Sequence, residues 1–304
     1  MCTLLETRTV SGVLSGNQKP RSWDVAAKGG MPYLVAGLTA LAVVSRPLRV
    51  LASALLVPVA VASRRTISHD SRSKYPFENR EKVRVVSANV LYKNKRCTEA
   101  ASMLTETDAD VLVLVEHSER IRQFIPDSVY PYRVIHESSA DDRATEISVL
   151  SKTPLEQVGL VRAYHRTFPL LSTTVNGAPL LVIPVHTMAP HRKQDKITWE
   201  EEMAGLLEHV KTIADPLVVC GDFNATLTHA PMARLLDHAP LRSAMSLMKK
   251  GWVPTWGPLG VVPVLALDHV LVSPEVIVLK AQSVRTPGSD HRCVVADMTI
   301  PRSA

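Results

Sequence analysis

Residues 217–224 read LVVCGDFN and join a short apolar strand to an acid and an amide. The run Leu-Val-Val-Cys predicts a strand that is buried on both faces. Asp222 and Asn224 follow at the end of this strand. Because a rigid strand positions the side chains at its end while loops admit a substrate, this segment predicts both a sheet and a functional site.

The same arrangement recurs at five other strand termini of the predicted sheets. Each terminus carries an amide, a carboxylate or an imidazole, and the residues are Asn89, Glu116, His186, Asp268 and the pair Asp290 and His291. A single acid after a strand is usually a solvated turn residue, and a single histidine there is usually structural. The joint set, with almost no other polar residue at these termini, predicts one shared site.

Strands and helices alternate from residue 82 onward. We expect helices at 98–106 and 193–211. We expect strands at 83–88, 111–115, 132–137, 146–151, 170–175, 180–185, 217–220, 266–272, 276–284 and 293–298. Asn176 and Gly177 predict a two-residue hairpin turn. Hairpins mixed with helical crossovers predict an α/β fold with a mixed sheet, or with two packed sheets and helices outside.

The net positive charge of the chain comes from its first 80 residues. Of 304 residues, 35 are Lys or Arg and 29 are Asp or Glu, which gives a net charge of +6. Residues 1–80 hold 11 basic and 4 acidic side chains, so residues 81–304 hold 24 and 25 and carry a net charge of −1. A nucleic-acid-binding domain usually carries its basic footprint on itself, so nucleic acid is not the expected partner. Basic residues beside apolar runs suit a membrane surface.

Two uncharged apolar runs, 29–45 and 50–63, are separated by the sequence RPLR. As helices they would be about 25 and 21 Å long, shorter than the hydrocarbon core of roughly 30 Å. We expect two short membrane helices, and one long span is disfavoured by two buried arginines. A late signal sequence and a buried soluble hairpin are the alternatives. The expected organisation is a disordered tail at 1–28, the membrane segment at 29–63, a linker at 64–81 and a catalytic domain at 82–304.

Four cysteines are scattered without a paired spacing, which signals neither a zinc site nor a disulfide framework. Cys220 and Cys293 lie inside apolar runs. We expect both to be buried and inert thiols.

Seven segments resemble, in the same order, the motifs of the endonuclease/exonuclease/phosphatase superfamily, which includes DNase I-like nucleases, inositol polyphosphate phosphatases and neutral sphingomyelinases. They are SANVLY, LVLVEH, VLSKTPL, PVHTMAP, VVCGDFNAT, LDHVLVS and GSDHRCVVAD. The resemblance covers roughly residues 82–300 and is closer to a membrane-anchored bacterial branch, some of whose members act in glycopeptide resistance. It implies a four-layer α/β sandwich, with two mixed sheets face to face and helices outside.

The resemblance also implies a role for each residue of the set. Asn89, Glu116 and Asp290 would hold Mg²⁺, or Mn²⁺, because a hard cation prefers oxygen ligands. Asp222 would deprotonate the attacking water, with Asn224 holding Asp222 or donating to a phosphoryl oxygen. His186 and His291 would contact phosphoryl oxygens, and Asp268 would fix the tautomer of His291. Glu146 aligns with a carboxylate that pairs with His186 in the DNase I-like branch.

These residues predict a metal-dependent hydrolase of phosphoester or pyrophosphate bonds, acting on a membrane lipid or its headgroup. A DNase I-like nuclease is the first alternative, which the nearly neutral domain and the lack of recognisable DNA-binding loops disfavour. A catalytically dead, membrane-tethered binding module is the second, disfavoured because the metal-binding Glu and both histidines are present. Counting basic residues around two spans places the domain in the cytoplasm. The resembling branch places it outside the cell membrane, which is the location we expect.

Overall fold

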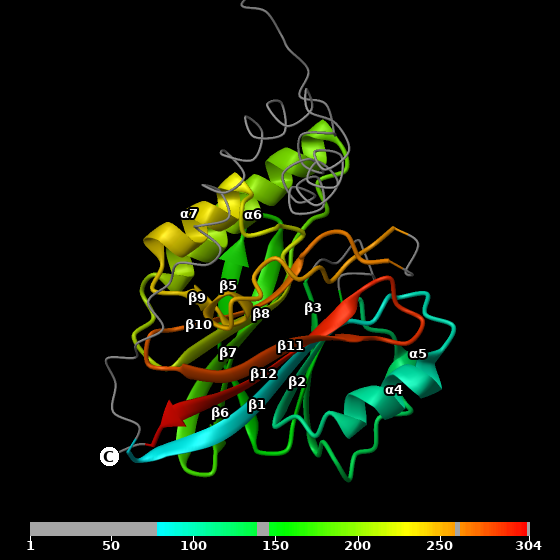
Figure 1. Ribbon diagram of the computed structural model, residues 1–304, viewed down its shortest axis with the longest axis vertical. Coiled ribbons are helices and arrows are strands. Elements are labelled where there is room, and N and C mark those ends of the chain that lie inside the picture. The colour runs from blue at the N-terminus through cyan, green and yellow to red at the C-terminus, as the bar shows by residue number, and fades with distance from the viewer. Residues whose placement is uncertain (1–77, 139–145, 259–261, 303–304) are drawn as a thin grey trace, which may run out of the picture.

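The computed structural model describes residues 78–138, 146–258 and 262–302, which form two mixed β-sheets with helices (Figure 1). The expected tail, membrane segment and most of the linker lie outside the described residues. Within the described ranges, none of the helices has both the length and the apolar character needed to cross a membrane.

The first sheet has six strands in the order β11-β12-β1-β2-β4-β3. Its strands are β1 (Arg80–Asn89), β2 (Val111–Val115), β3 (Tyr132–Glu137), β4 (Glu146–Ser151), β11 (Ile277–Arg285) and β12 (Arg292–Pro301). β1 and β2 are parallel and are joined through helix α4 (Cys97–Glu106). All the other pairs are antiparallel.

The second sheet has the order β5-β6-β7-β8-β10-β9. Its strands are β5 (Leu155–Ala163), β6 (Arg166–Val175), β7 (Ala178–His186), β8 (Leu217–Asp222), β9 (Arg242–Ser243) and β10 (Asp268–Val272). β7 and β8 are the parallel pair, joined through α6 (Lys193–Val210). The remaining helices are α5 (Glu119–Arg122), α7 (Ala230–His238) and α8 (Ala244–Leu247).

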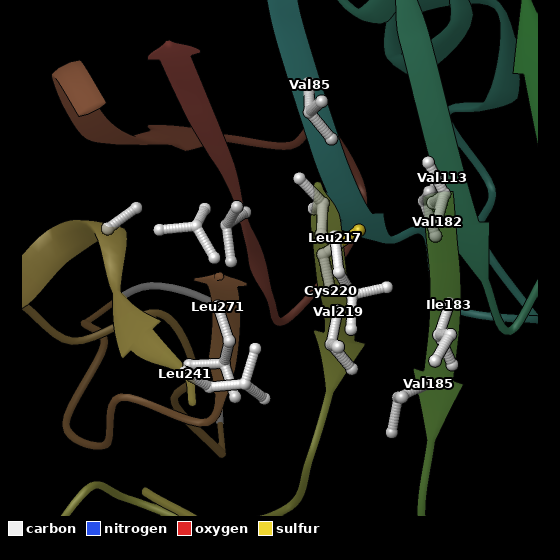
Figure 2. Packing of buried hydrophobic residues seen from close by; sticks show 14 of the residues in the cluster. Val85, Val113, Val182, Ile183, Val185, Leu217, Val219, Cys220, Leu241 and Leu271 are labelled. Carbon is white, nitrogen blue, oxygen red and sulfur yellow. The ribbon is translucent and has the colours of Figure 1, made fainter. Parts of the chain in front are cut away.

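Two apolar clusters show that the sheets lie between helices. On β1, Val83 and Val85 belong to the cluster between the sheets, and Val86 and Ala88 belong to the cluster under α4. This alternation follows from the two-residue period of a strand. Figure 2 shows Val85 and Val113 from the first sheet among Val182, Leu217 and Val219 from the second.

The larger cluster also contains Trp199, Met203 and Leu206 of α6, so that helix covers the outer face of the second sheet. Figure 1 shows α6 and α7 together on one side of the molecule, and α4 and α5 on the other. The expected four-layer α/β sandwich is therefore the architecture of the described part of the chain.

Every strand expected from the sequence is present, with ends that differ by a few residues. Asn176 and Gly177 form the expected hairpin turn between β6 and β7, with φ angles of 51° and 84°. Strand β5 was not expected, because it is an edge strand with several exposed residues and therefore no continuous apolar run. The first strand of the described residues, β1, begins at Arg80, two residues before the domain boundary that the sequence predicts. Cys220 and Cys293 are buried as expected, and burial raises the pKa of each thiol to about 12.

Gly221 allows strands β7 and β8 to approach closely where they reach the candidate site. Its φ is +148°, and a Cβ atom there would lie 1.8 Å from the carbonyl oxygen of Val185. No side chain fits this position unless the two strands separate. The strands end one residue later, at His186 and Asp222.

We expect Gly221→Ala to lower the free energy of unfolding by about 3 kcal/mol, because the new methyl group meets backbone rather than a flexible side chain. Urea unfolding of the full chain in detergent measures this. Gly159→Ala is the control, since its Cβ would lie at an ordinary 3.4 Å from Leu170 and should cost less than about 1 kcal/mol. Equal losses in the two variants would contradict this explanation.

Candidate active site

Strand register places three of the polar residues in one row across the second sheet. His186 on β7 pairs with Asp222 on β8, and Asp222 pairs with Asp268 on β10. Paired residues on neighbouring strands project to the same face, so the three side chains share one face of the sheet, with Asp222 in the middle of the row. The row is buried, with Asp222 and Asp268 at most 2% exposed.

Asn89 connects this row to the first sheet. Its amide nitrogen donates to Oε1 of Glu116 at 2.9 Å and to Oδ2 of Asp222 at 3.1 Å. Its amide oxygen accepts from the N–H of Leu91 at 3.0 Å. The nitrogen of Asn89, and not the oxygen expected to bind a metal, therefore faces the two carboxylates in this orientation of the amide.

Glu116 follows β2 in a left-handed backbone conformation, with φ +51°. Such a conformation costs a non-glycine residue roughly 1–2 kcal/mol and is often found at functional positions. Its carboxylate accepts from the N–H of Tyr92 at 3.3 Å and lies 4.0 Å from Nε2 of His186. The side chain is 22% exposed, so its oxygens can reach a ligand.

His291 lies between two acids. Its Nδ1 is 2.9 Å from Oδ2 of Asp268, and its Nε2 is 3.6 Å from Oδ2 of Asp222. Burial alone would lower the pKa of His291, but the carboxylates of Asp268, Asp222 and Asp290 outweigh it and raise the pKa to about 10. The imidazole is therefore a cation at neutral pH, and Asp268 pairs with it as expected.

His186 has the opposite electrostatic environment. Burial lowers its pKa well below the ordinary value, and the positive charges of Arg166 and His291 lower it further. Its Nδ1 is buried and has no hydrogen-bond partner among the described residues. The site therefore holds one neutral and one charged imidazole. When the environment moves the pKa values of two like groups apart in this way, the two groups can take different chemical roles.

Asp222 is held by its neighbours in a form suited to proton transfer. Burial raises its pKa to about 7, and Asp268 adds to that effect while the charge of His291 opposes it. Its Oδ1 accepts from the backbone N–H of Asn224 at 2.8 Å. The side-chain amide of Asn224 donates to the carbonyl of Thr187 at 2.9 Å. Asn224 thus holds Asp222 in place, through its backbone.

The sequence gave no reason to single out Thr255 and Trp256, yet they organise the acids. The hydroxyl oxygen of Thr255 accepts from the N–H groups of Leu267 and Asp268 at 3.0 Å. The indole N–H of Trp256 donates to Oδ2 of Asp290 at 2.9 Å. Oδ1 of Asp290 is buried and has no partner among the described residues, so it remains available to a ligand.

Two groups of side chains could hold a cation. Among the described residues, Asp222, Asp268 and His291 form one such group, because their possible ligand atoms lie within 4.8 Å of one another. Because His291 is protonated and its Nδ1 is engaged by Asp268, its nitrogens are poor ligands there. Glu116, with a partly exposed carboxylate, and Asp290, with an unsatisfied oxygen, fit a hard cation better.

The expected pairing of Glu146 with His186 is not formed. Oε1 of Glu146 lies 3.2 Å from Nδ1 of His117, which also contacts the hydroxyl of Ser148 at 3.0 Å. Burial lowers the pKa of His117 to about 4, so this imidazole is neutral. The sequence motif predicts where Glu146 lies in its strand, but it does not predict which histidine the side chain contacts.

Comparison with known proteins identifies the family. The sequence model of the Endonuclease/Exonuclease/phosphatase family matches residues 86–291, which include all eight residues of the candidate site. The chain belongs to this family. A search of curated proteins gives no match.

Solved structures agree on the fold. An endonuclease/exonuclease/phosphatase from Beutenbergia cavernae DSM 12333 aligns with a TM-score of 0.59 and 17% identity over 72% of each chain. TDP2 of D. rerio, humanized by 14 mutations, aligns with a TM-score of 0.59 and 15% identity over 71% of this chain and 98% of its own. SmcL aligns with a TM-score of 0.53 and 19% identity over 73% and 99%. At these identities the likeness concerns the fold.

We expect the imidazole of His291 to stay protonated through neutral pH and to lose its proton only as the pH rises towards about 10. Asp268→Asn removes the nearest negative charge and should lower this titration midpoint markedly. Nitrogen-resolved NMR of the full chain in detergent measures it, with the resonance assigned by its loss in His291→Ala. Exposed Asp237, changed to Asn, is the control. Titration of His291 near pH 6.5 in the wild type would contradict the assignment.

Proposed function

We propose that this protein is a divalent-metal-dependent hydrolase of phosphoester or pyrophosphate bonds, acting on a phosphorylated membrane lipid or its headgroup. The observation that carries the hydrolase assignment is the placement of His291 between Asp268 and Asp222 of this row, beside Glu116 and Asn89. The members of the family act on phosphoester bonds, and this row supplies a base, a fixed positive charge and oxygen ligands in one place.

Glu116 and Asp290 are the residues we assign to the cation, with Mg²⁺ as the expected ion and Mn²⁺ as a substitute. The cation, when bound, would neutralise charge on the phosphoryl group. Asn89 would keep the carboxylate of Glu116 in place through its amide nitrogen. A different rotation of the Asn89 amide would present its oxygen to the cation instead, as the family resemblance implies.

The protein side chains divide the chemistry of hydrolysis among them. Asp222, with a pKa of about 7, takes a proton from the attacking water while the oxygen of that water bonds to phosphorus. The phosphorus–oxygen bond to the leaving group breaks, and the released oxygen takes a proton from solvent. The imidazolium of His291 stabilises the negative charge that develops on the phosphoryl oxygens, and neutral His186 contacts them from the side of Glu116.

An apolar loop beside the site favours a lipid over a soluble substrate. Residues 251–267 contain no charged side chain, and Thr255 is their only hydroxyl or amide side chain. In this run Trp252 is 52% exposed and Val262 is 66% exposed. Trp256 pairs through its backbone with His291, which ties the loop to the site. Exposed apolar loops are uncommon, and Trp in particular favours the membrane–water interface.

The apolar runs at 29–45 and 50–63 support attachment to the cell membrane. The outer side as the location of the catalytic domain is supported only by the resemblance to the membrane-anchored bacterial branch. The net charge of −1 on residues 81–304 supports a substrate that contributes one reacting phosphate group rather than a polyanion. The D. rerio TDP2 structure with a single strand DNA product keeps a nuclease as the competing outcome of the test below.

We expect Glu116→Gln to lower Mg²⁺-dependent turnover of bis(p-nitrophenyl) phosphate by at least about 100-fold. The amide keeps the shape of the side chain but removes its charge, so the thermal midpoint should stay near that of the wild type. Glu137→Gln, on an exposed position of β3, is the control and should change neither. Full turnover of the Glu116 variant at saturating Mg²⁺ would refute the metal assignment.

We expect Trp252→Ser to slow hydrolysis of a polyprenyl pyrophosphate in phosphatidylcholine vesicles by about tenfold, because the interface loses a large apolar contact. Hydrolysis of soluble bis(p-nitrophenyl) phosphate should not change. Leu279→Ser is the control, since Leu279 is 42% exposed on β11. Equal slowing on the soluble and the vesicle substrate would show that Trp252 does not act through the lipid surface.

Plasmid DNA, assayed beside the lipid at 50 and 200 mM salt, separates the competing functions. A surface that neutralises six to ten phosphates would lose roughly 10³–10⁵ in affinity over this range. Salt-dependent nicking of plasmid without phosphate release from the lipid would make the protein a nuclease. No turnover of any of the three substrates with Mg²⁺ or Mn²⁺ would make it a binding module.

A further inference from the structure

A buried ion pair lies behind the candidate site and takes no part in the chemistry described above. It joins Arg166, the first residue of β6, to Glu202 in the middle of α6, with Nε and Oε1 3.2 Å apart. The side chains are 5% and 0% exposed. Charged side chains are almost never buried to this extent unless they are paired, so the position of this pair needs a reason.

Both members of the pair bind the backbone that follows His186. Nη1 of Arg166 donates to the carbonyl oxygen of His186 at 2.8 Å. Oε2 of Glu202 accepts from the N–H of Met188 at 2.6 Å. Between these two contacts, the N–H of Thr187 donates to the carbonyl of Asp222 at 3.1 Å. Three consecutive residues are therefore fixed by a strand, a helix and the neighbouring strand.

The stability of the fold gives no sufficient reason for this pair. Burial raises the pKa of Glu202 to about 7, against the opposing effect of Arg166, so keeping this carboxylate charged is costly. Two apolar side chains of similar volume often replace a buried ion pair with no loss of stability. What apolar side chains cannot do is hydrogen-bond the carbonyl of His186 and the N–H of Met188.

His186 depends on such external support more than His291 does. Nδ1 of His291 is fixed by Asp268 at 2.9 Å. Nδ1 of His186 has no partner in the described ranges, and its Nε2 has only the 4.0 Å approach of Glu116. Because no described residue makes a short hydrogen bond to the ring of His186, the position of this imidazole depends on the backbone that carries it.

We propose that Arg166 and Glu202 are positioning residues that fix the backbone of residues 186–188 and thereby hold the imidazole of His186 against the reacting phosphoryl group. This inference rests on the proposed hydrolase function. Misplacement of a reacting group by about 1 Å can cost on the order of 100-fold in rate. A small movement of the strand end is therefore enough to matter.

The test replaces both charges at once, as Arg166→Met with Glu202→Met in the full chain, so that no unpaired charge is left in the interior. With bis(p-nitrophenyl) phosphate and saturating Mg²⁺, we expect kcat to fall about 100-fold while KM changes little. The thermal midpoint should fall only slightly, because removal of a costly buried charge pair offsets the loss of two hydrogen bonds to the backbone. The matched control replaces the pair Arg84 and Asp297, which joins β1 to β12, with Met at both positions and should leave kcat unchanged.

Two further measurements separate positioning from a general structural role. In a His186→Ala background, replacing the pair should lower kcat no further, because the group it positions is gone. Amide exchange in the peptide that contains Met188 should become faster in the double Met variant, while exchange in β8 stays slow. The exchange measurement does not depend on turnover.

If the double Met variant keeps the wild-type kcat, or if its effect is undiminished in the His186→Ala background, the inference is wrong. Unchanged exchange at Met188 would also overturn it. If the double Met variant does not fold, Arg166→Met alone is judged by the two kcat criteria, because it removes the donor to the carbonyl of His186 while the carboxyl group of Glu202 can take up a proton. Absence of wild-type turnover on any phosphoester would instead refute the proposed function, and the exchange result would still report on the backbone.

Discussion

The contacts of one amide group connect the two halves of this molecule. The side-chain nitrogen of Asn89 donates to Glu116 in its own sheet and to Asp222 in the other sheet. Two carboxylates from different sheets can lie this close only if a donor between them offsets their repulsion, since charges of like sign repel strongly where water is excluded. Asn89 is itself buried, so its amide has no alternative partner in solvent. Asn89 therefore joins the two sheets by hydrogen bonds at the candidate site.

The two histidines show how a symmetrical arrangement acquires different chemical roles. His186 is the last residue of β7 and His291 directly precedes β12, and both imidazoles are largely buried. Burial lowers the pKa of each, so burial cannot distinguish them. Three carboxylates act on His291 and convert it to a cation. His186 has one carboxylate near it, that of Glu116 at 4.0 Å, and the positive charges of Arg166 and His291 add to burial in lowering its pKa. The identity of the neighbouring strands, rather than the residue type, decides which imidazole is charged.

Much of this arrangement could be predicted from sequence, and what could not has a physical reason. Strand ends such as Asn89 and Asp222 are visible because a polar residue interrupts an apolar run. Trp256 gives no such sign, because its contact with Asp290 depends on where a loop returns in space. No feature of the sequence around Arg166 marks it as buried, because the residue that pairs with it, Glu202, lies in α6. Glu146 was placed in the correct strand, yet its partner is His117, a choice that side-chain geometry makes and sequence order does not.

The charge of the site gives an independent argument for a cation. Glu116, Asp222, Asp268 and Asp290 bring four carboxylates to one edge, and His291 is the only cationic side chain that contacts them within the described residues. Arg166, the nearby guanidinium, is already paired with Glu202. Even with Asp222 partly protonated near pH 7, the site is strongly negative, and a phosphoester anion would be repelled from it. If a divalent cation binds Glu116 and the unsatisfied oxygen of Asp290, as we propose, it would reverse that repulsion and favour substrate binding as well as the chemical step.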